Sequence, residues 1–183
     1  MIVKAKNNSP ILLRKLKHTD FDSLFDYLQN LSPETRKRFG PHPFDKQSII
    51  DFYRSSGKIS AYIAIDTETN KIIAYSIIKI GFLEHDSFRL QSYGLNLNGE
   101  TDCTFAPSVA DKWQSMGVGN LLFRFILSDL ENSGINRIIL WGGVQSDNEK
   151  AVNFYRKHGF TIQGQFEFNG PNFDMMLNIN STD

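Results

Sequence analysis

Residues 114–122 read Gln-Ser-Met-Gly-Val-Gly-Asn-Leu-Leu and join an apolar run that ends at Val109 to a helical pattern that continues to about Asn132. Glycines at 117 and 119 let the backbone approach a ligand closely, because they carry no side chain. The first N–H groups of a helix lack partners within it and lie at the positive end of its dipole. The stretch therefore predicts a phosphate site. Glycines also occur in ordinary turns and in tight helix packing, and the loop alone leaves that alternative open.

The composition is that of an ordinary globular protein. The 183 residues are 40% hydrophobic and 22% charged, which suits one domain over residues 1–183 that buries a substantial core. Lys plus Arg and Asp plus Glu both number 20, so no overall basic field attracts nucleic acid or an anionic membrane. Because no run reads as a signal sequence or a membrane span, we expect a cytoplasmic protein.

The single cysteine, Cys103, has no partner for an internal disulfide. It has no neighbouring cysteine or clustered histidine that would make a zinc site. The sequence therefore predicts no metal dependence.

Hydrophobic periodicity predicts alternating helices and strands. Strands are expected at 11–17, 59–65, 71–80, 101–109, 137–141, 160–168 and 173–179, and the polar segment 81–99 predicts no firm element. Helices are expected to begin near 19, 32, 45, 117 and 146, the last with a capping box of Ser146 against Glu149. This order predicts an α/β fold with one central mixed, mostly antiparallel sheet of about seven strands, flanked by helices on both faces.

Pro107 lies inside the strand that precedes the glycine loop. Proline has no N–H to donate to a β-ladder, so a strand that contains it lacks a partner on one side. We therefore expect the sheet to open at this point.

Two sequence blocks lie in order along the second half of the chain. The first is Gln/Arg-x-x-Gly-x-Gly/Ala, found at Gln114, Gly117 and Gly119. The second is Asn-x-x-Ala-x-x-x-Tyr-x-x-x-Gly-Phe, found at Asn148, Ala151, Tyr155, Gly159 and Phe160. With these blocks the chain resembles the GNAT superfamily of acyl-CoA-dependent N-acetyltransferases, most strongly over residues 101–160. Residues 31–57 and 81–99 are not covered by the resemblance.

Two other phosphate-binding motifs fail on particular residues. A dinucleotide fingerprint requires a third glycine where this chain has Leu122. A P-loop requires lysine and then serine or threonine after its last glycine, where this chain has Asn120 and Leu121.

The resemblance implies a single GNAT-like domain that uses acetyl-CoA as co-substrate. The acetyl group would pass directly to a primary amine of a small molecule, peptide or protein, and a homodimer is one form of assembly that it allows. Backbone N–H groups of residues 114–120 would hold the coenzyme A pyrophosphate, and the pantetheine arm would pair with backbone near Val109. The coenzyme-binding residues that it implies are Val109, Gln114, Ser115, Met116, Gly117, Val118, Gly119, Asn120 and Asn148.

Two residues of the second block have both a functional and a structural interpretation. Asn148 would bond the pantetheine arm, but asparagine at a helix start also caps the helix locally. Tyr155 stands where the family often has the general acid that protonates the departing thiolate, a role that suits a phenol of pKa ~10. Tyr155 could equally be an aromatic of the core face, which residues 148, 151, 152 and 155 share.

The chain departs from the family at the general base. Many relatives have a glutamate eleven positions before the motif, where this chain has Cys103. Asp102 and Glu100 point to the opposite face of a regular strand, while Glu84, His85 and Asp86 lie in the uncovered segment. Cys103 itself reads as a small buried hydrophobe and not as an acyl carrier, since nothing nearby in sequence would activate it.

Residues 39–44, Phe-Gly-Pro-His-Pro-Phe, are either part of the acceptor pocket wall, with His42, Phe39 and Phe44, or a packed surface loop. Two functions follow from the sequence. The chain is an acetyl-CoA-dependent N-acetyltransferase, or it is a non-catalytic acyl-CoA-binding or sensing module on the same fold.

Overall fold

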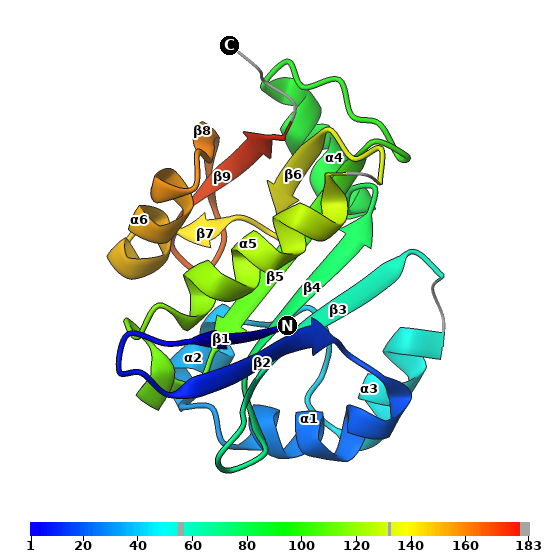
Figure 1. The fold of residues 1–183 in the computed structure, drawn as a ribbon. Helices are drawn as coiled ribbons and strands as arrows, with labels where there is room; N and C mark the ends of the chain where they lie inside the picture. The colour runs from blue at the N-terminus through cyan, green and yellow to red at the C-terminus, as the bar shows by residue number, and fades with distance from the viewer. Residues whose placement is uncertain (55–56, 132, 180–183) are drawn as a thin grey trace. The chain divides into compact units, whose positions relative to one another are not determined.

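A mixed β-sheet is the centre of the computed structural model, which describes residues 1–54, 57–131 and 133–179 (Figure 1). Among these residues the sheet has nine strands in the order β1-β2-β3-β4-β5-β6-β9-β7, and β8 pairs with β9. The expected α/β fold with a mixed sheet is confirmed, with nine strands in place of about seven. The strands are β1 (Ile2–Lys4), β2 (Pro10–Lys15), β3 (Ile59–Asp66), β4 (Lys71–Ile80), β5 (Asp102–Val109), β6 (Arg137–Leu140), β7 (Val144–Gln145), β8 (Thr161–Glu167) and β9 (Pro171–Asn178).

Helices flank this sheet. They are α1 (Phe21–Gln29), α2 (Pro33–Arg38), α3 (Lys46–Arg54), α4 (Glu84–Ser92), α5 (Val118–Leu130) and α6 (Glu149–Lys157), with short 3-10 helices η1 (His18–Asp20) and η2 (Asp111–Trp113). By its internal contacts the chain divides into two compact units, residues 1–78 with 106–128 and residues 79–105 with 129–183. A single domain over residues 1–183 stays a prediction.

The first unit holds the antiparallel ladder β1-β2-β3, in which Ile2 pairs with Leu12 and Leu12 with Ile65. Helix α1 buries Leu24, Tyr27 and Leu28, whose spacing places them on one face. Helix α2 begins where the sequence predicts, because the Ser32 side chain accepts a hydrogen bond from the Thr35 N–H and Pro33 needs no partner at the first turn.

The second unit holds the parallel pair β5–β6, whose register runs from Asp102–Arg137 to Phe105–Leu140. Pro107 lies beyond the end of that ladder, as expected for a strand that opens there. Strands β8 and β9 form the expected hairpin. Asn169 and Gly170 in its turn both have positive φ, of 52° and 109°, which suits the tight turns that asparagine and glycine favour.

The sequence did not predict helix α4, because its apolar residues do not follow the helical period. Of its nine residues only Asp86 and Leu90 are buried, so one of its two inward positions is charged. Arg89 offsets the cost of burying the Asp86 carboxylate, because it binds Asp86 at 2.8 Å and Asp174 of β9 at 2.7 Å. The helix is therefore attached to its unit by ion pairs in place of an apolar stripe.

The predicted capping box at Ser146 is wrong. The N-cap of α6 is Asn148, whose Oδ1 accepts from the Ala151 N–H at 3.3 Å. The Ser146 N–H instead donates to the Pro171 carbonyl at 2.9 Å, because residues 144–145 form the short strand β7 that pairs with β9. Strands β1 and β7 were missed because two or three residues are too few to show alternation. Asn132, the expected end of the long helix, lies outside the described residues.

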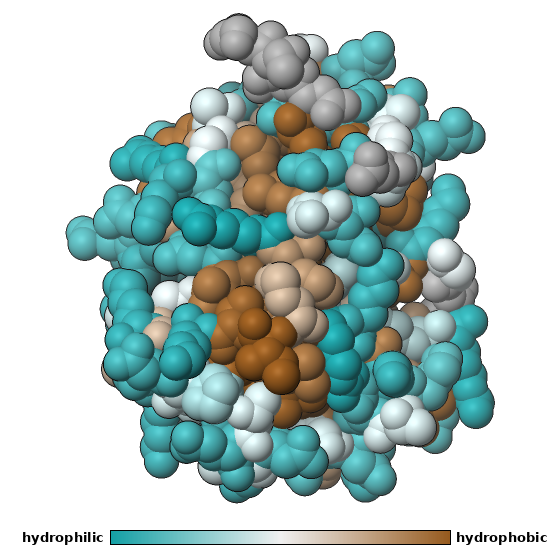
Figure 2. Space-filling model, in the orientation of Figure 1, coloured by the Kyte–Doolittle hydropathy of each residue, from teal (hydrophilic) through white to brown (hydrophobic). Residues whose placement is uncertain are grey.

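An exposed apolar area lies on the first unit, over the region of β1 and β2 (Figures 1 and 2). Met1 and Ile2 are 60% and 70% exposed, and β1 is the first strand of the sheet order. No helix among the described residues has the length and apolar character needed to cross a membrane.

The ion pair between Asp102 and Arg137 generates a prediction about stability. The Asp102 side chain is 3% exposed and receives two hydrogen bonds from Arg137, at 2.6 and 2.9 Å. Arg137→Ala leaves a buried carboxylate unpaired, so we expect the free energy of unfolding to fall by about 3 kcal/mol or more in urea denaturation. Arg124→Ala, which removes an exposed guanidinium from α5, should cost under about 0.5 kcal/mol. Equal losses would contradict a structural role for the pair.

Candidate functional site

The glycine loop has a left-handed backbone just before a helix begins. Strand β5 ends at Val109, and helix α5 begins at Val118. Ser115 and Gly117 have φ values of 62° and 84°, and the Leu121 N–H donates to the Gly117 carbonyl at 3.1 Å. The N–H groups of the first helical turn therefore precede the first intrahelical bond and lie at the positive end of the dipole. This is the arrangement that binds phosphate.

Lys6 supports the loop from the β1–β2 connection. Its N–H donates to the Met116 carbonyl at 3.0 Å. Its side chain crosses Gly117, and a Cβ at residue 117 would lie 3.4 Å from the Lys6 Cγ. A Cβ at this distance from a flexible side chain would make an ordinary contact, so it is the positive φ of residue 117 that favours glycine.

Asp111 ties the same loop to helix α2. Its carboxylate accepts from the Ser32 N–H at 2.9 Å, the Ser32 hydroxyl at 2.7 Å and the Thr35 hydroxyl at 2.7 Å. Burial opposes ionisation of Asp111, but these hydrogen bonds outweigh it and hold the pKa of Asp111 below its ordinary value. The carboxylate is thus a fixed anchor at the start of the loop.

The structure brings Val109 and the loop together. The Gln114 side-chain amide lies 3.4 Å from the Val109 carbonyl and 3.5 Å from the Thr35 hydroxyl, while the next residue, Ala110, donates its N–H to Ile73 of β4 at 2.9 Å. The end of β5 and the first residue of the loop are therefore in contact within the first unit.

The other two predicted residues share helix α6 in the second unit. Asn148 is its N-cap, so its Oδ1 already makes the local helix bond. Tyr155 is 7% exposed and packs against Phe154 and Phe160, with ring centroids 5.3 Å apart in both pairs. Burial raises the pKa of the Tyr155 phenol above its ordinary value, so near neutral pH it can only donate a proton.

The strand before the loop supplies no general base. Cys103 is fully buried, and burial, followed by the nearby Asp102 charge, raises the pKa of its thiol to about 12. Asp102 is neutralised by Arg137 and also accepts from the Asn98 N–H at 2.8 Å. Glu100 is exposed. A carboxylate held in a bidentate ion pair is a poor proton acceptor, so Asp102 stabilises the fold instead.

The acidic and histidine residues of segment 81–99 are on helix α4. Asp86 is bound by Arg89, Glu84 is exposed, and the His85 side chain is 74% exposed with its Nε2 3.7 Å from Asp86. The structure thus uses Asp86 to attach the helix.

Residues 39–44 form a packed loop. Phe39 and His42 are buried, and Phe39 lies edge-on to Tyr75 of β4 with 5.7 Å between ring centroids. His42 lies 4.7 Å from the ring of Phe52 on α3. Of the two interpretations of this loop, the packed one describes the structure.

Sequence reasoning missed a buried hydroxyl network centred on Tyr75. Its hydroxyl bonds to the Tyr53 hydroxyl and to the His42 Nε2, the latter at 3.0 Å. The Ser108 hydroxyl of β5 donates to the Tyr75 carbonyl at 3.1 Å and bonds to the Tyr27 hydroxyl at 2.9 Å. Of the residues in this network, only His42, which lies between two prolines, stood out in the sequence. The tyrosines had the pattern of ordinary core residues.

Metal ligands do not gather in the part of the chain that the structure describes, where no three His, Cys, Asp or Glu side chains could hold one ion. The chemistry that the described groups can perform is anion binding at the start of α5 and proton transfer through phenols and imidazole.

Comparison with known proteins agrees with this geometry. The model of the acetyltransferase (GNAT) family matches residues 23–160, which is more than half of the chain. The chain belongs to this family. The matched region contains both sequence blocks and the glycine loop, so the expected GNAT-like resemblance is confirmed.

The individual relatives either match a short part of this chain or have low sequence identity to it. A mycothiol acetyltransferase of Corynebacterium efficiens is 36% identical over 58 residues, which are 32% of this chain and 19% of that protein. The GNAT domain of S. lividans PAT has a TM-score of 0.75 at 18% identity, covering 97% of this chain and 96% of that one. A spermidine N-acetyltransferase from Vibrio cholerae, in complex with CoA and spermine, has a TM-score of 0.66 at 18% identity, covering 92% and 95%. These two structures show that the GNAT fold is shared.

The burial of Cys103 leads to a prediction about its chemistry. With a pKa of about 12, about one thiol in ten thousand is ionised at pH 8, and only the thiolate is nucleophilic. We expect the native protein to react negligibly with Ellman's reagent at pH 8 and to react fully in guanidinium. Mass spectrometry after acetyl-CoA treatment should find no acetyl group on Cys103. An acetylated Cys103 would show that it is an acyl carrier.

Proposed function

We propose that this GNAT-family acetyltransferase moves an acetyl group from acetyl-CoA to a primary amine by direct transfer. The observation that carries the proposal is the start of helix α5, which follows the end of β5 at Val109 and a left-handed turn at Gly117. An anion is stabilised there by hydrogen bonds and by the dipole.

The residues present fit coenzyme A as the donor. Residues 114–120 would hold its pyrophosphate through backbone N–H groups, and the side chain of Lys6 lies against Gly117 of the same loop. A cation at the positive end of a helix is unfavourable by itself, but it becomes favourable beside a bound phosphate. Val109, at the end of β5 beyond the last β5–β6 pair, would meet the pantetheine arm.

The proposed chemistry is attack of a neutral amine on the thioester carbonyl. The carbon–nitrogen bond forms, the carbon–sulfur bond breaks, the nitrogen loses a proton to water or a side chain, and the thiolate takes a proton. Tyr155 is proposed as the donor of that proton, because its phenol stays protonated near neutral pH. Asn148 is proposed to bind the donor through the part of its amide that does not cap α6.

The acceptor is a small-molecule, peptide or protein amine, and we propose a cytoplasmic enzyme that needs no metal and that can form a homodimer.

A specific observation favours a second function. The position of the usual glutamate holds a thiol that does not ionise, and the neighbouring Asp102 is bound by Arg137. A non-catalytic module that binds or senses acyl-CoA would need no general base. The two functions share the donor site, so they differ only in whether an amine releases coenzyme A from its thioester.

Coenzyme binding tests the donor site. Acetyl-CoA at a hundred times its Kd should stabilise the protein by about 2.7 kcal/mol and raise Tm by roughly 5–10 °C, and neither NAD nor ATP should do so. Gly117→Ala should abolish most of this shift, because alanine disfavours the positive φ of residue 117 and would change the backbone of the loop.

Gly134→Ala is the matched control for this experiment. Gly134 also has positive φ, of 78°, but it has open space around it, so its substitution should lower Tm without changing the acetyl-CoA shift. A shift with NAD and none with acetyl-CoA would overturn the donor assignment.

Release of free thiol from acetyl-CoA tests catalysis. With a panel of primary amines, at least one should release thiol well above the rate without amine. Tyr155→Phe should lower kcat by about 10²-fold while leaving the Kd for acetyl-CoA nearly unchanged, since it removes only a proton donor. Tight coenzyme binding without release for any amine would favour the sensing module, and unchanged turnover in Tyr155→Phe would exclude its role as general acid.

A further inference from the structure

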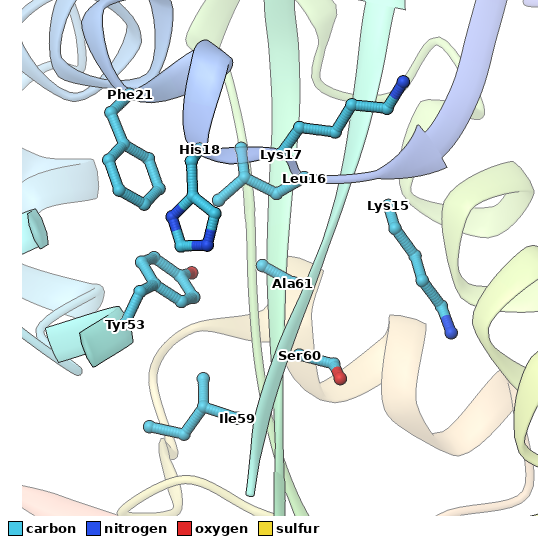
Figure 3. A pocket seen from close by; sticks show the side chains of 9 residues that line it. All are labelled: Lys15, Leu16, Lys17, His18, Phe21, Tyr53, Ile59, Ser60 and Ala61. Carbon is cyan, nitrogen blue, oxygen red and sulfur yellow. The ribbon is translucent and has the colours of Figure 1, made fainter. Parts of the chain in front are cut away.

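The first unit contains a pocket of ≈190 Å3 between the end of β2, the start of β3 and helices α1 and α3. Figure 3 shows the rings of His18, Phe21 and Tyr53 gathered on one side of it, while the chains of Lys15 and Lys17 extend away on the other. The Phe21 and Tyr53 rings are stacked, with 5.5 Å between their centroids. The pocket therefore offers an aromatic wall to a small ligand and a positive charge at its rim.

The Tyr53 ring in this wall carries the hydroxyl that begins the buried network. Its hydroxyl bonds to that of Tyr75, and the Tyr75 hydroxyl bonds to the His42 Nε2. These three side chains come from α3, from β4 and from the loop before α3. A continuous chain of hydrogen bonds thus leads from the pocket wall to a buried imidazole.

The direction of each hydrogen bond in this chain follows from its last member. The His42 Nδ1 lies 2.7 Å from the Pro43 carbonyl, which can only accept, so Nδ1 carries the proton. Burial lowers the pKa of His42 despite the raising effects of the Pro43 bond and the Asp45 charge, so the imidazole is neutral near neutral pH. Its Nε2 then accepts from Tyr75, and the Tyr75 oxygen accepts from Tyr53.

Strand β5 holds the middle of the chain beside the proposed donor site. The Ser108 hydroxyl donates to the Tyr75 carbonyl, and Ser108 directly precedes Val109. The charged and titratable groups that face His42 are Asp45, before α3, and Tyr75 on β4. His42 is thus a buried base in the same unit as the glycine loop and Val109.

We propose that this pocket is the acceptor site and that the Tyr53–Tyr75–His42 chain takes the proton that the acceptor amine loses during acetyl transfer. This rests on the proposed function. The amine proton goes to the Tyr53 oxygen as the Tyr53 proton goes to Tyr75 and the Tyr75 proton to the His42 Nε2. His42 becomes an imidazolium and returns its proton to solvent before the next turnover. Tyr53 is then the catalytic residue, while Tyr75 and His42 act through it.

The lining of the pocket also points to a class of acceptor. Phe21, Tyr53 and Leu16 offer apolar and aromatic surface to the acceptor. The acceptor is therefore a primary amine with an aromatic or apolar body.

Kinetics with phenethylamine as acceptor test the chain of hydrogen bonds. Tyr53→Phe keeps the ring and removes only the hydroxyl, so kcat should fall about 100-fold while KM for acetyl-CoA stays within twofold. Tyr93→Phe is the matched control, because it removes a tyrosine hydroxyl that bonds Asp174 in the second unit and takes no part in the Tyr53–Tyr75–His42 chain. It should leave kcat within about twofold. Equal losses in both variants, or kcat/KM for spermidine above that for phenethylamine, would overturn the proposal.

Nitrogen-15 NMR of the histidines tests the same chain without any turnover. In the wild type, His42, identified by its absence in His42→Gln, should be the neutral Nδ1–H tautomer at pH 7, with a pKa below the ordinary value of about 6.5. Phenethylamine should shift its Nε2 signal in the wild type and not in Tyr53→Phe. An Nε2–H tautomer, or a shift that is the same in both proteins, would overturn the relay. Failure of the proposed function would give a different result. No amine would then release thiol from acetyl-CoA, while the NMR results would still be those expected.

Discussion

The turn at Gly117 before helix α5 is the constraint on which the proposed donor site depends. Its backbone has a positive φ, and the Lys6 side chain lies against it. The first N–H groups of α5 follow this turn and lie at the positive end of the helix dipole. Asp111, bound to Ser32 and Thr35, holds the preceding residues in place. These contacts hold the backbone of the loop in place, which suits recognition of a phosphate by backbone N–H groups.

A second constraint is that a buried polar group must have a partner. Desolvating a hydroxyl or an imidazole without a hydrogen bond costs about 1–3 kcal/mol, so Tyr75, Tyr53 and His42 are stable in the core only as a connected set. In the same way Asp102 is stable in the other unit because Arg137 neutralises it. The neutral His42 keeps a lone pair on Nε2 that can accept a proton, and we propose it as the end of the proton path.

The sequence predicted the elements whose signals are local. The hairpin turn at Asn169 and Gly170, the cap at Ser32 and the glycine loop were all recognised, because short stretches determine turn geometry and helix starts. Helix α4 was missed because its inward Asp86 breaks the apolar period, and the cap of α6 was placed at Ser146 because strand β7 is too short to detect. The coenzyme-binding set from Val109 to Asn120, with Asn148 and Tyr155, stays a prediction that rests on the family pattern.

The sequence by itself determined the family, the position of the glycine loop before a helix and the cysteine at position 103 where many relatives have glutamate. Only the tertiary structure decided that His42 is buried and which hydroxyl groups it bonds. His42 and Tyr75 are 33 residues apart, and Tyr27 and Ser108 are 81 apart. Their meeting depends on strand register and on the face from which each side chain projects. Local periodicity in the sequence indicates that a residue is buried. It does not indicate which residue it contacts in the core, because that partner lies on another element of the fold.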